Sequence, residues 1–179
     1  NDFRIESHLI GLYNANNINA AVAIGKYFGV KESDSKSAIE NYIPNNNRSQ
    51  LIEKNGNHII LDAYNANPTS MEAAILNFQN SFTGKKMIFL GDMLELGEES
   101  PVEHSRILEL AYKTGCEKII LVGPRFTTAA QSSQEPNVVC LENSTQAAEW
   151  INANRQVNCT VLIKGSRGSK MEKVLEGLK

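Results

Sequence analysis

The chain has 179 residues, and its 18 lysines and arginines against 20 aspartates and glutamates give a formal net charge of −2. This length allows one domain, or one domain and part of another, with a sizeable buried core. Hydrophobic residues make up 41% and charged residues 21%, which is typical of globular proteins and excludes a disordered chain. The balanced charge argues against a globally basic nucleic-acid binder, and no apolar run approaches the roughly 18 residues of a membrane span.

The cysteines and the N-terminal sequence indicate in which cellular compartment the protein functions. The three cysteines, Cys116, Cys140 and Cys159, are scattered and form no CxxC pair. Such a set is typical of reduced thiols in a cytosolic protein and argues against a disulfide framework or a zinc site. Residues 1–10 lack the basic and apolar regions of a signal peptide. We therefore expect a cytoplasmic protein that binds neither membranes nor nucleic acids.

The first quarter of the chain predicts two helices and then a turn-rich joint. Small and apolar residues recur at helical spacing over 18–29, and Gly29 is a candidate C-cap. A second helix is predicted at 34–43, with Asp34 as a candidate N-cap. The sequence PNNNRSQ (44–50) then favours turns over helix or strand. We interpret this joint as a domain boundary.

After the joint, short apolar runs alternate with longer helical patterns. Strands are predicted at 58–63, 86–92, 118–123, 137–141 and 159–165. Helices are predicted at 69–81, 101–114, 126–132, 144–153 and 169–178. Strands that are apolar throughout are buried on both faces, as in a parallel sheet covered by helices. The predicted fold class is therefore α/β, a doubly wound, Rossmann-like, mostly parallel sheet with helices on both faces.

In such a sheet, ligands bind beyond the carboxyl ends of the strands, and three of these ends are polar here. The first is LDAYNANP (61–68), after which Thr69 or Ser70 could cap the next helix. A carboxylate there can bind ribose hydroxyls, and amides can hold a phosphate or carbonyl oxygen. Alternatively, these residues only form the turn, since Asn and Asp do so readily. The candidate binding residues of this end are Asp62, Tyr64, Asn65 and Asn67.

The second polar end, LGDMLELGEES (90–100), is acidic and is followed by a histidine. Its candidate residues are Asp92, Glu95, Glu98, Glu99 and His104. Acidic groups beside a histidine could bind Mg²⁺ or an amine, or take part in proton transfer. An acid-rich helix start, favoured by the helix dipole, explains the same pattern without a function.

The third polar end, IKGSRGSK (163–170), places Lys164, Ser166 and Arg167 around two glycines before a helix. Basic side chains and free backbone N–H groups suit a carboxylate or a phosphate. The spacing is not that of a P-loop, and no G-x-G-x-x-G follows the first strand. A solvated loop remains the alternative for this short sequence.

Taken in order, these motifs resemble one family. The succession GLYNANNINAAVA (11–23), NRSQ (47–50), LDAYNANPTSM (61–71), LGDMLELGEES with a later His (90–104) and IKGSRGSKME (163–172) resembles the Mur ligases of peptidoglycan synthesis. Within them, the match is closest to the type that joins D-alanyl-D-alanine to UDP-MurNAc-tripeptide. The resemblance covers nearly the whole chain but only part of such an enzyme.

The resemblance implies a division of the chain into two parts. Residues 1–44 resemble the tail of the central ATP-binding domain, and residues 45–179 resemble the C-terminal Rossmann-like domain. The family's phosphate loop and Mg²⁺ ligands would then lie upstream, and this part alone would not catalyse ligation. The family forms an amide with ATP through an acyl phosphate, so the implied cofactors are ATP and Mg²⁺, bound by a monomer.

The resemblance also implies roles for the candidate residues. Asn14 and Asn17 match the motif whose amides contact adenine, although Tyr13 replaces the usual histidine, and Arg48 matches an arginine that reaches the ATP phosphates. Asn47 stands where that arginine is usually preceded by glycine. Asp62 matches the acid that binds ribose, with Tyr64, Asn65 and Asn67 on the same nucleotide-facing edge. Lys164, Ser166 and Arg167 match the region that handles the incoming dipeptide. The acidic end and His104 match the family motif without an assigned role, and no metal site is expected in this part.

Two alternatives remain open at this point. One is a related enzyme, such as the ligase that adds meso-diaminopimelate or a folylpolyglutamate synthase, although the YNANP and KGSR sequences argue against both. The other is a free-standing α/β module that binds a nucleotide or a dipeptide without turnover.

The size of the native protein separates the module from the ligase. Three domains of ordinary size predict a band of roughly 45–50 kDa in an immunoblot of the source cells with an antibody to this chain. A band near the 19.8 kDa of the chain itself would instead support the free-standing module.

Overall fold

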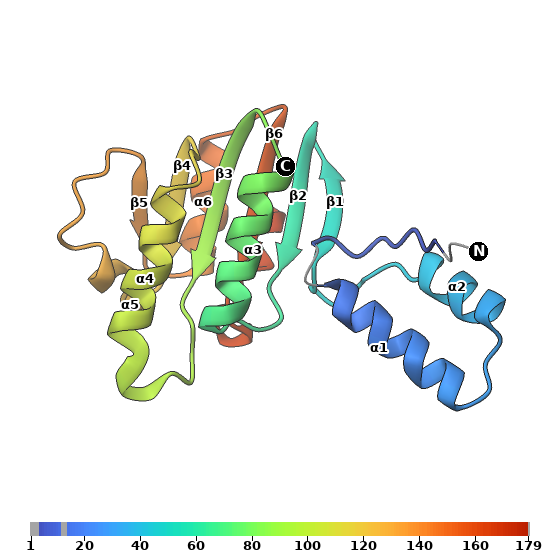
Figure 1. The fold of residues 1–179 in the computed structure, drawn as a ribbon. Coiled ribbons are helices and arrows are strands. Elements are labelled where there is room, and N and C mark those ends of the chain that lie inside the picture. The colour runs from blue at the N-terminus through green and yellow to red at the C-terminus, as the bar shows by residue number, and fades with distance from the viewer. Residues whose placement is uncertain (1–3, 12–13, 179) are drawn as a thin grey trace.

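The computed structural model describes residues 4–11 and 14–178, so Tyr13 lies outside the described residues. Its centre is one six-stranded sheet in the order β1-β2-β6-β3-β4-β5 (Figure 1). The strands are β1 (Gln50–Lys54), β2 (Asn57–Asp62), β3 (Lys85–Gly91), β4 (Lys118–Val122), β5 (Val138–Leu141) and β6 (Cys159–Lys164). All neighbours are parallel except β1 and β2.

Helices cover both faces of this sheet. The first group is α3 (Pro68–Ser81), α4 (Ser100–Tyr112) and α5 (Pro124–Ala129), and the second is α6 (Ser144–Ala153) and α7 (Lys173–Gly177). Two short 3-10 turns, Gly97–Glu99 and Arg167–Ser169, precede α4 and α7. The predicted doubly wound α/β fold is confirmed, because both faces of the parallel strands are buried under helices.

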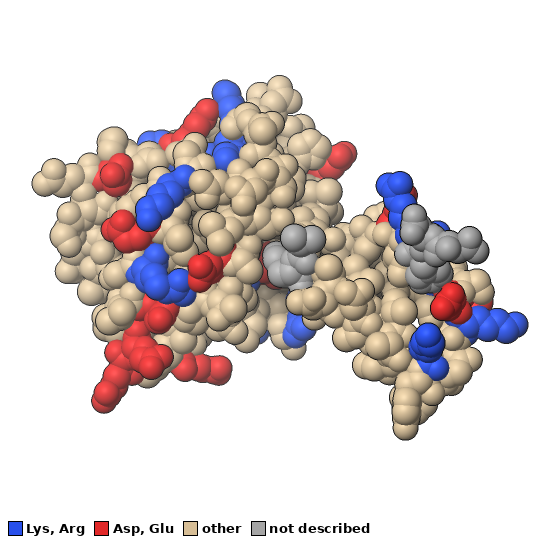
Figure 2. Space-filling view, viewed as in Figure 1, with Lys and Arg blue, Asp and Glu red and all other residues tan. Residues whose placement is uncertain are grey.

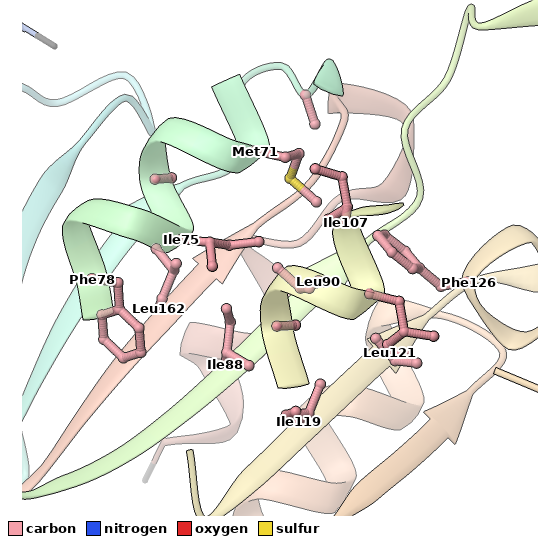
Figure 3. Close-up of a cluster of buried hydrophobic side chains, with 14 of the residues drawn as sticks. Met71, Ile75, Phe78, Ile88, Leu90, Ile107, Ile119, Leu121, Phe126 and Leu162 are labelled. Atoms are coloured by element: carbon pink, nitrogen blue, oxygen red, sulfur yellow. The ribbon is translucent and has the colours of Figure 1, made fainter. Parts of the chain in front are cut away.

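Alternation along the strands divides the core into two clusters, one on each side of the sheet. Ile88 and Leu90 of β3 face the side where α3, α4 and α5 pack, and Met71, Ile75 and Phe78 of α3 lie against them (Figure 3). Met87 and Phe89 of the same strand face α6 and α7. This two-sided burial explains why the strands read as continuous apolar runs in the sequence.

The edge strand β1 was not predicted. It pairs antiparallel with β2 through a turn at Asn55 and Gly56, both of which adopt positive φ angles of 52° and 73°. An Asn-Gly pair between two β-type runs is a strong hairpin signal, and it is present in the sequence. The strand was overlooked because only alternate residues of QLIEK are even partly buried, so no apolar run marks it.

The helical pair α1 (Asn14–Tyr27) and α2 (Glu32–Glu40) projects beyond β1, away from the sheet (Figure 1). Gly29 ends α1 as predicted, with φ at 78° and hydrogen bonds that close a Schellman motif. The predicted N-cap at Asp34 is wrong, because Lys31 is the N-cap residue of α2. Asp34 lies in the first turn of that helix, where the helix dipole stabilises a carboxylate. No described residue of these two helices except Asn14 is buried.

Candidate functional site

The turn between β2 and α3 is built by the residues that the sequence singled out. Asn67 is the N-cap of α3: its Oδ1 accepts a hydrogen bond from the Ser70 backbone N–H at 2.8 Å, and Ser70 Oγ accepts one from the Asn67 N–H at 3.1 Å. The prediction that Thr69 or Ser70 would be the N-cap is therefore wrong by two or three residues. Pro68 occupies the first helical position, where its missing N–H costs no hydrogen bond.

The joint before β1 folds back over this turn. Asn47 adopts a left-handed φ of 58°, which Asn tolerates better than most residues, so the turn forms without the glycine of the family pattern. Its carbonyl oxygen accepts a hydrogen bond from the Ala63 N–H at 2.8 Å. The guanidinium carbon of Arg48 lies 3.9 Å from the centre of the Tyr64 ring, a cation–π contact.

Two amides order the start of α1, and one of them reaches the joint. The buried Asn14 donates from Nδ2 to the Ile10 carbonyl at 2.7 Å and to Ser49 Oγ at 3.5 Å. Asn17 Nδ2 donates to Asn14 Oδ1 at 3.0 Å. The helix that the sequence assigned to a different domain is therefore tied by side chains to the edge of the sheet.

These segments enclose one hollow of about 300 Å³ at the carboxyl end of β2. All seven residues that the sequence predicted for nucleotide contact line it, together with Ser49, Ser70 and Lys164. The seven are Asn14, Asn17, Arg48, Asp62, Tyr64, Asn65 and Asn67. The hollow offers amides, one carboxylate and one exposed guanidinium, a set that fits the base, the ribose and the phosphates of a nucleotide.

Lys164 belongs to this hollow rather than to the loop that follows it. Its Nζ lies 2.5 Å from Asp62 Oδ2 and 3.4 Å from the Asn65 carbonyl oxygen. Only 1% of the Lys164 side chain is exposed, against 14% of Asp62. The sequence grouped Lys164 with Ser166 and Arg167, and the structure separates them.

The side chains of Ser166 and Arg167 have different partners from that of Lys164 and from each other. The buried Ser166 accepts a hydrogen bond at Oγ from the Leu94 N–H at 2.9 Å and donates to the Ala66 carbonyl at 3.3 Å. It thereby joins the loops after β2, β3 and β6, so its hydroxyl is already hydrogen-bonded within the protein. Arg167 is exposed and pairs with Glu172 at 3.3 Å.

The acidic strand end is mainly structural. Asp92, 4% exposed, accepts hydrogen bonds from the N–H groups of Arg125 and Phe126, each at 3.0 Å, and so caps α5. Glu95 is exposed with a left-handed φ of 68°. Figure 2 shows acidic side chains gathered at the lower left of the surface. Glu98, Glu99 and Glu103 lie in the 3-10 turn and the first turn of α4, where the helix dipole stabilises carboxylates.

His104 holds the same loop from inside the core. Its side chain is fully buried; Nε2 accepts a hydrogen bond from the Met93 N–H at 3.0 Å, so the ring proton resides on Nδ1, which donates to the Ser100 carbonyl at 2.7 Å. Burial lowers the pKa of His104 from its ordinary value of 6.5, although the Ser100 carbonyl and Asp92 partly oppose this shift. A neutral imidazole with both nitrogens bonded to backbone is a structural element.

A second hollow, of about 500 Å³, lies beyond the carboxyl ends of β3 and β4 and was missed by the sequence analysis. Arg125, Lys170 and Lys173 line it, together with the N-terminus of α6, whose N-cap is Asn143. Lys173 Nζ donates to Thr145 Oγ1 at 3.3 Å. In the sequence, this hollow is marked only by Gly-Pro-Arg (123–125) at the end of the predicted strand 118–123. A single arginine in a turn is too weakly specific to predict a binding site.

Comparison with known proteins now gives the family. The family profile described as "Mur ligase, glutamate ligase domain" matches residues 47–167. The chain belongs to the Mur ligase family. The UDP-N-acetylmuramoyl-tripeptide–D-alanyl-D-alanine ligase of Bacillus subtilis (strain 168) is 31% identical over 176 residues, which are 95% of this chain and 38% of that protein. The ligase of the same name from Escherichia coli (strain K12) is 29% identical, with the same shares covered.

Solved structures of Mur ligases share the fold. A crystal structure of MurF from Acinetobacter baumannii is 27% identical, with a TM-score of 0.87 over 97% of this chain and 39% of that one. MurF ligase from Thermotoga maritima, solved in complex with ADP, is 22% identical, with a TM-score of 0.79 over 95% of this chain and 38% of that one. The chain thus spans less than half the length of the Mur ligases that it matches.

Within residues 4–11 and 14–178, no three His, Cys, Asp or Glu side chains form a group that could hold a metal ion. In that same part, no helix is long and apolar enough to cross a membrane.

The buried neutral His104 predicts a pH-dependent stability. Above the ordinary pKa of 6.5, both folded and unfolded chains keep this histidine neutral. Below it, the unfolded chain takes up a proton that the folded chain resists, so the free energy of unfolding should fall by up to about 1.4 kcal/mol per pH unit until the lowered folded pKa is reached. Urea unfolding between about pH 8 and pH 5 measures this slope.

Two variants test the source of the slope. His104→Gln should remove this contribution, whereas His58→Gln, on an exposed side chain, should retain it. An equal slope in the wild-type chain and in His104→Gln would contradict the assignment to His104.

Proposed function

We propose that this chain is the C-terminal part of an ATP-dependent ligase that adds D-alanyl-D-alanine to UDP-MurNAc-tripeptide in peptidoglycan synthesis. The observation that carries the proposal is that residues from α1, the joint and the end of β2 enclose one hollow of nucleotide-binding chemistry. The curated Mur ligases compared above carry the name of this reaction, which favours it over the related ligases.

The hollow beside Asp62 is the proposed nucleotide site. The amides of Asn14 and Asn17 suit the hydrogen-bonding edge of adenine, and the carboxylate of Asp62 suits the ribose hydroxyls. Arg48 is exposed, so its guanidinium can leave the Tyr64 ring and reach the phosphates when a facing domain closes. Tyr64, Asn65 and Asn67 complete the wall of the hollow.

The rest of the nucleotide site would come from the preceding part of the polypeptide. We infer that residues 1–44 are the tail of the central domain, because α1 and the segment after it expose Ile24, Tyr27 and Phe28 at 59%, 84% and 76%. Apolar side chains at such exposure are typical of a surface that packs against another domain. The phosphate loop and the Mg²⁺ ligands are assigned to that domain, since the described residues offer neither.

In the proposed reaction, the terminal carboxylate of the tripeptide attacks the γ-phosphorus of ATP, giving an acyl phosphate and ADP. The amine of D-alanyl-D-alanine then attacks the acyl carbon, an amine proton is lost, and the tetrahedral intermediate expels phosphate. This chain would hold the nucleotide and the dipeptide and exclude water from the acyl phosphate. Arg48 would balance phosphate charge in the closed state.

The second hollow is the proposed dipeptide site. Three cations, Arg125, Lys170 and Lys173, line it with two carboxylates, Asp92 and Glu142, and the first turn of the 10-residue helix α6 opens onto it. Cationic side chains and a helix N-terminus suit the terminal carboxylate of a dipeptide. Its place at the same edge of the sheet as the nucleotide hollow would let the dipeptide amine point toward the acyl phosphate.

The location and wider role follow from the same proposal. We infer a cytoplasmic protein, because Cys116, Cys140 and Cys159 are all free thiols, as is usual in a reducing compartment. Its product would supply cell-wall synthesis, so loss of the activity should affect cell shape and division.

Asp62→Asn in the full-length ligase tests the nucleotide site. Loss of a charged hydrogen-bond acceptor for the ribose should raise the KM for ATP about tenfold or more. Steady-state kinetics at saturating tripeptide and dipeptide give this value. Asp34→Asn, on the surface of α2, is the matched control and should leave the KM for ATP unchanged. An unchanged KM for ATP in Asp62→Asn would remove the nucleotide assignment.

Arg125→Ala and Arg167→Ala, compared side by side, test the dipeptide site. Arg125→Ala should raise the KM for D-alanyl-D-alanine about tenfold, because a cationic partner of the carboxylate is lost, and spare the KM for ATP. Arg167→Ala should leave both values near those of the wild type. The reverse pattern would return the dipeptide to the Arg167 loop predicted from the sequence.

A further inference from the structure

The buried pair of Lys164 and Asp62 stands where two distant strands end. The residues are 102 positions apart, and they are direct partners in the parallel register of β2 and β6. On these strands Ile60 and Leu162 face the core under α3, so Asp62 and Lys164, each two residues further on, point to that same face. The register therefore sets the ammonium and the carboxylate side by side.

The two partners of the ion pair differ in burial, so they are not equally accessible from the hollow. Lys164 is 1% exposed, while the Asp62 side chain is 14% exposed and lines the nucleotide hollow. Both residues line the hollow, and the carboxylate is the more exposed of the two partners. With its Nζ held by Asp62 and by the Asn65 carbonyl, Lys164 is poorly placed to bind a dipeptide.

Both oxygens of Asp62 are already held. Oδ2 accepts the hydrogen bond from Lys164 at 2.5 Å, and Oδ1 accepts one from the Ser49 N–H at 3.3 Å. An ionised carboxylate has about four lone-pair positions, so acceptor capacity remains on each oxygen for a ligand hydroxyl. A carboxylate fixed on both oxygens before the ligand arrives loses little rotational freedom on binding.

We propose that Lys164 is a positioning residue of the nucleotide site, which orients Asp62 toward the ribose hydroxyls. This inference rests on the proposed nucleotide site and replaces the dipeptide-binding role that the sequence suggested for Lys164. The buried ammonium also holds Asn65 by its carbonyl, so a residue of β6 fixes both the acid and the turn that follows it.

A double-mutant cycle in the full-length ligase tests the inference, with Asp62→Asn, Lys164→Met and the double variant. Each single variant should raise the KM for ATP about tenfold. The double variant should be no worse than the worse single variant, because Lys164 acts only through Asp62. The KM for D-alanyl-D-alanine should stay within about twofold of the wild type in all three. Lys85→Met, an exposed lysine at the opposite end of β3, is the matched control.

The outcomes distinguish the inference from the proposed function. In one outcome, Asp62→Asn raises the KM for ATP, and the KM of the double variant rises by the product of the two single effects. Lys164 then acts independently of Asp62, and only the inference is overturned. A raised KM for the dipeptide in Lys164→Met, or a lower melting temperature with an unchanged KM for ATP, also overturns only the inference. No change in Asp62→Asn overturns the nucleotide site itself.

Folding of the variants is controlled within the cycle. Asp62→Asn leaves the buried ammonium of Lys164 without its charged partner, and Lys164→Met leaves the carboxylate of Asp62 without its own, so both single variants are at risk of unfolding. The double variant removes both charges, and its melting temperature and KM for ATP, set against those of Asp62→Asn, still show whether Lys164 has an effect of its own.

Discussion

The parallel pairing of β2 with β6 is the constraint on which the candidate site depends. This pairing sets Asp62 opposite Lys164, and the ion pair between them anchors the end of both strands. A lysine with 1% exposure is stable only with a partner, since an unpaired buried ammonium is strongly unfavourable. The turn at Asn65, the joint at Ser49 and the start of α1 are all fastened to this pair directly or through one further residue.

Several polar residues in the family motifs hold the loops of this edge in place. Asp92 caps α5, His104 binds two backbone groups, and Ser166 joins the loops that follow three strands. Buried polar groups with all their hydrogen bonds made specify one conformation, because any shift leaves a group unpaired. The two hollows therefore lie between loops that are fixed by these contacts, and the side chains that remain exposed there are free to meet ligands.

The two hollows fit a division of labour between this domain and the one proposed to precede it. The hollow at the end of β2, proposed above as the nucleotide site, is open on one side, which leaves room for a facing domain. Arg48, stacked on Tyr64 at the joint between the helical pair and the sheet, lies where such a closure would act. A reaction through an acyl phosphate requires water to be excluded, and a site divided between two bodies can open for substrates and close for chemistry.

The sequence by itself determined the fold class, the five parallel strands and the three polar strand ends, because apolar runs and helical periodicity are local patterns that burial on two faces imposes. The resemblance of its motifs to the Mur ligases also singled out the seven residues around the hollow at the end of β2, since each of these motifs is continuous in the chain. The edge strand β1 carried an Asn-Gly turn but no apolar run, and it was missed. Which polar residues are buried in hydrogen bonds and which line a hollow was decided only by the tertiary structure. Lys164 pairs with a residue 102 positions away, and Ser166 joins loops from three strands. Strand register and burial set these partners, and neither is encoded in the spacing of residues within one motif.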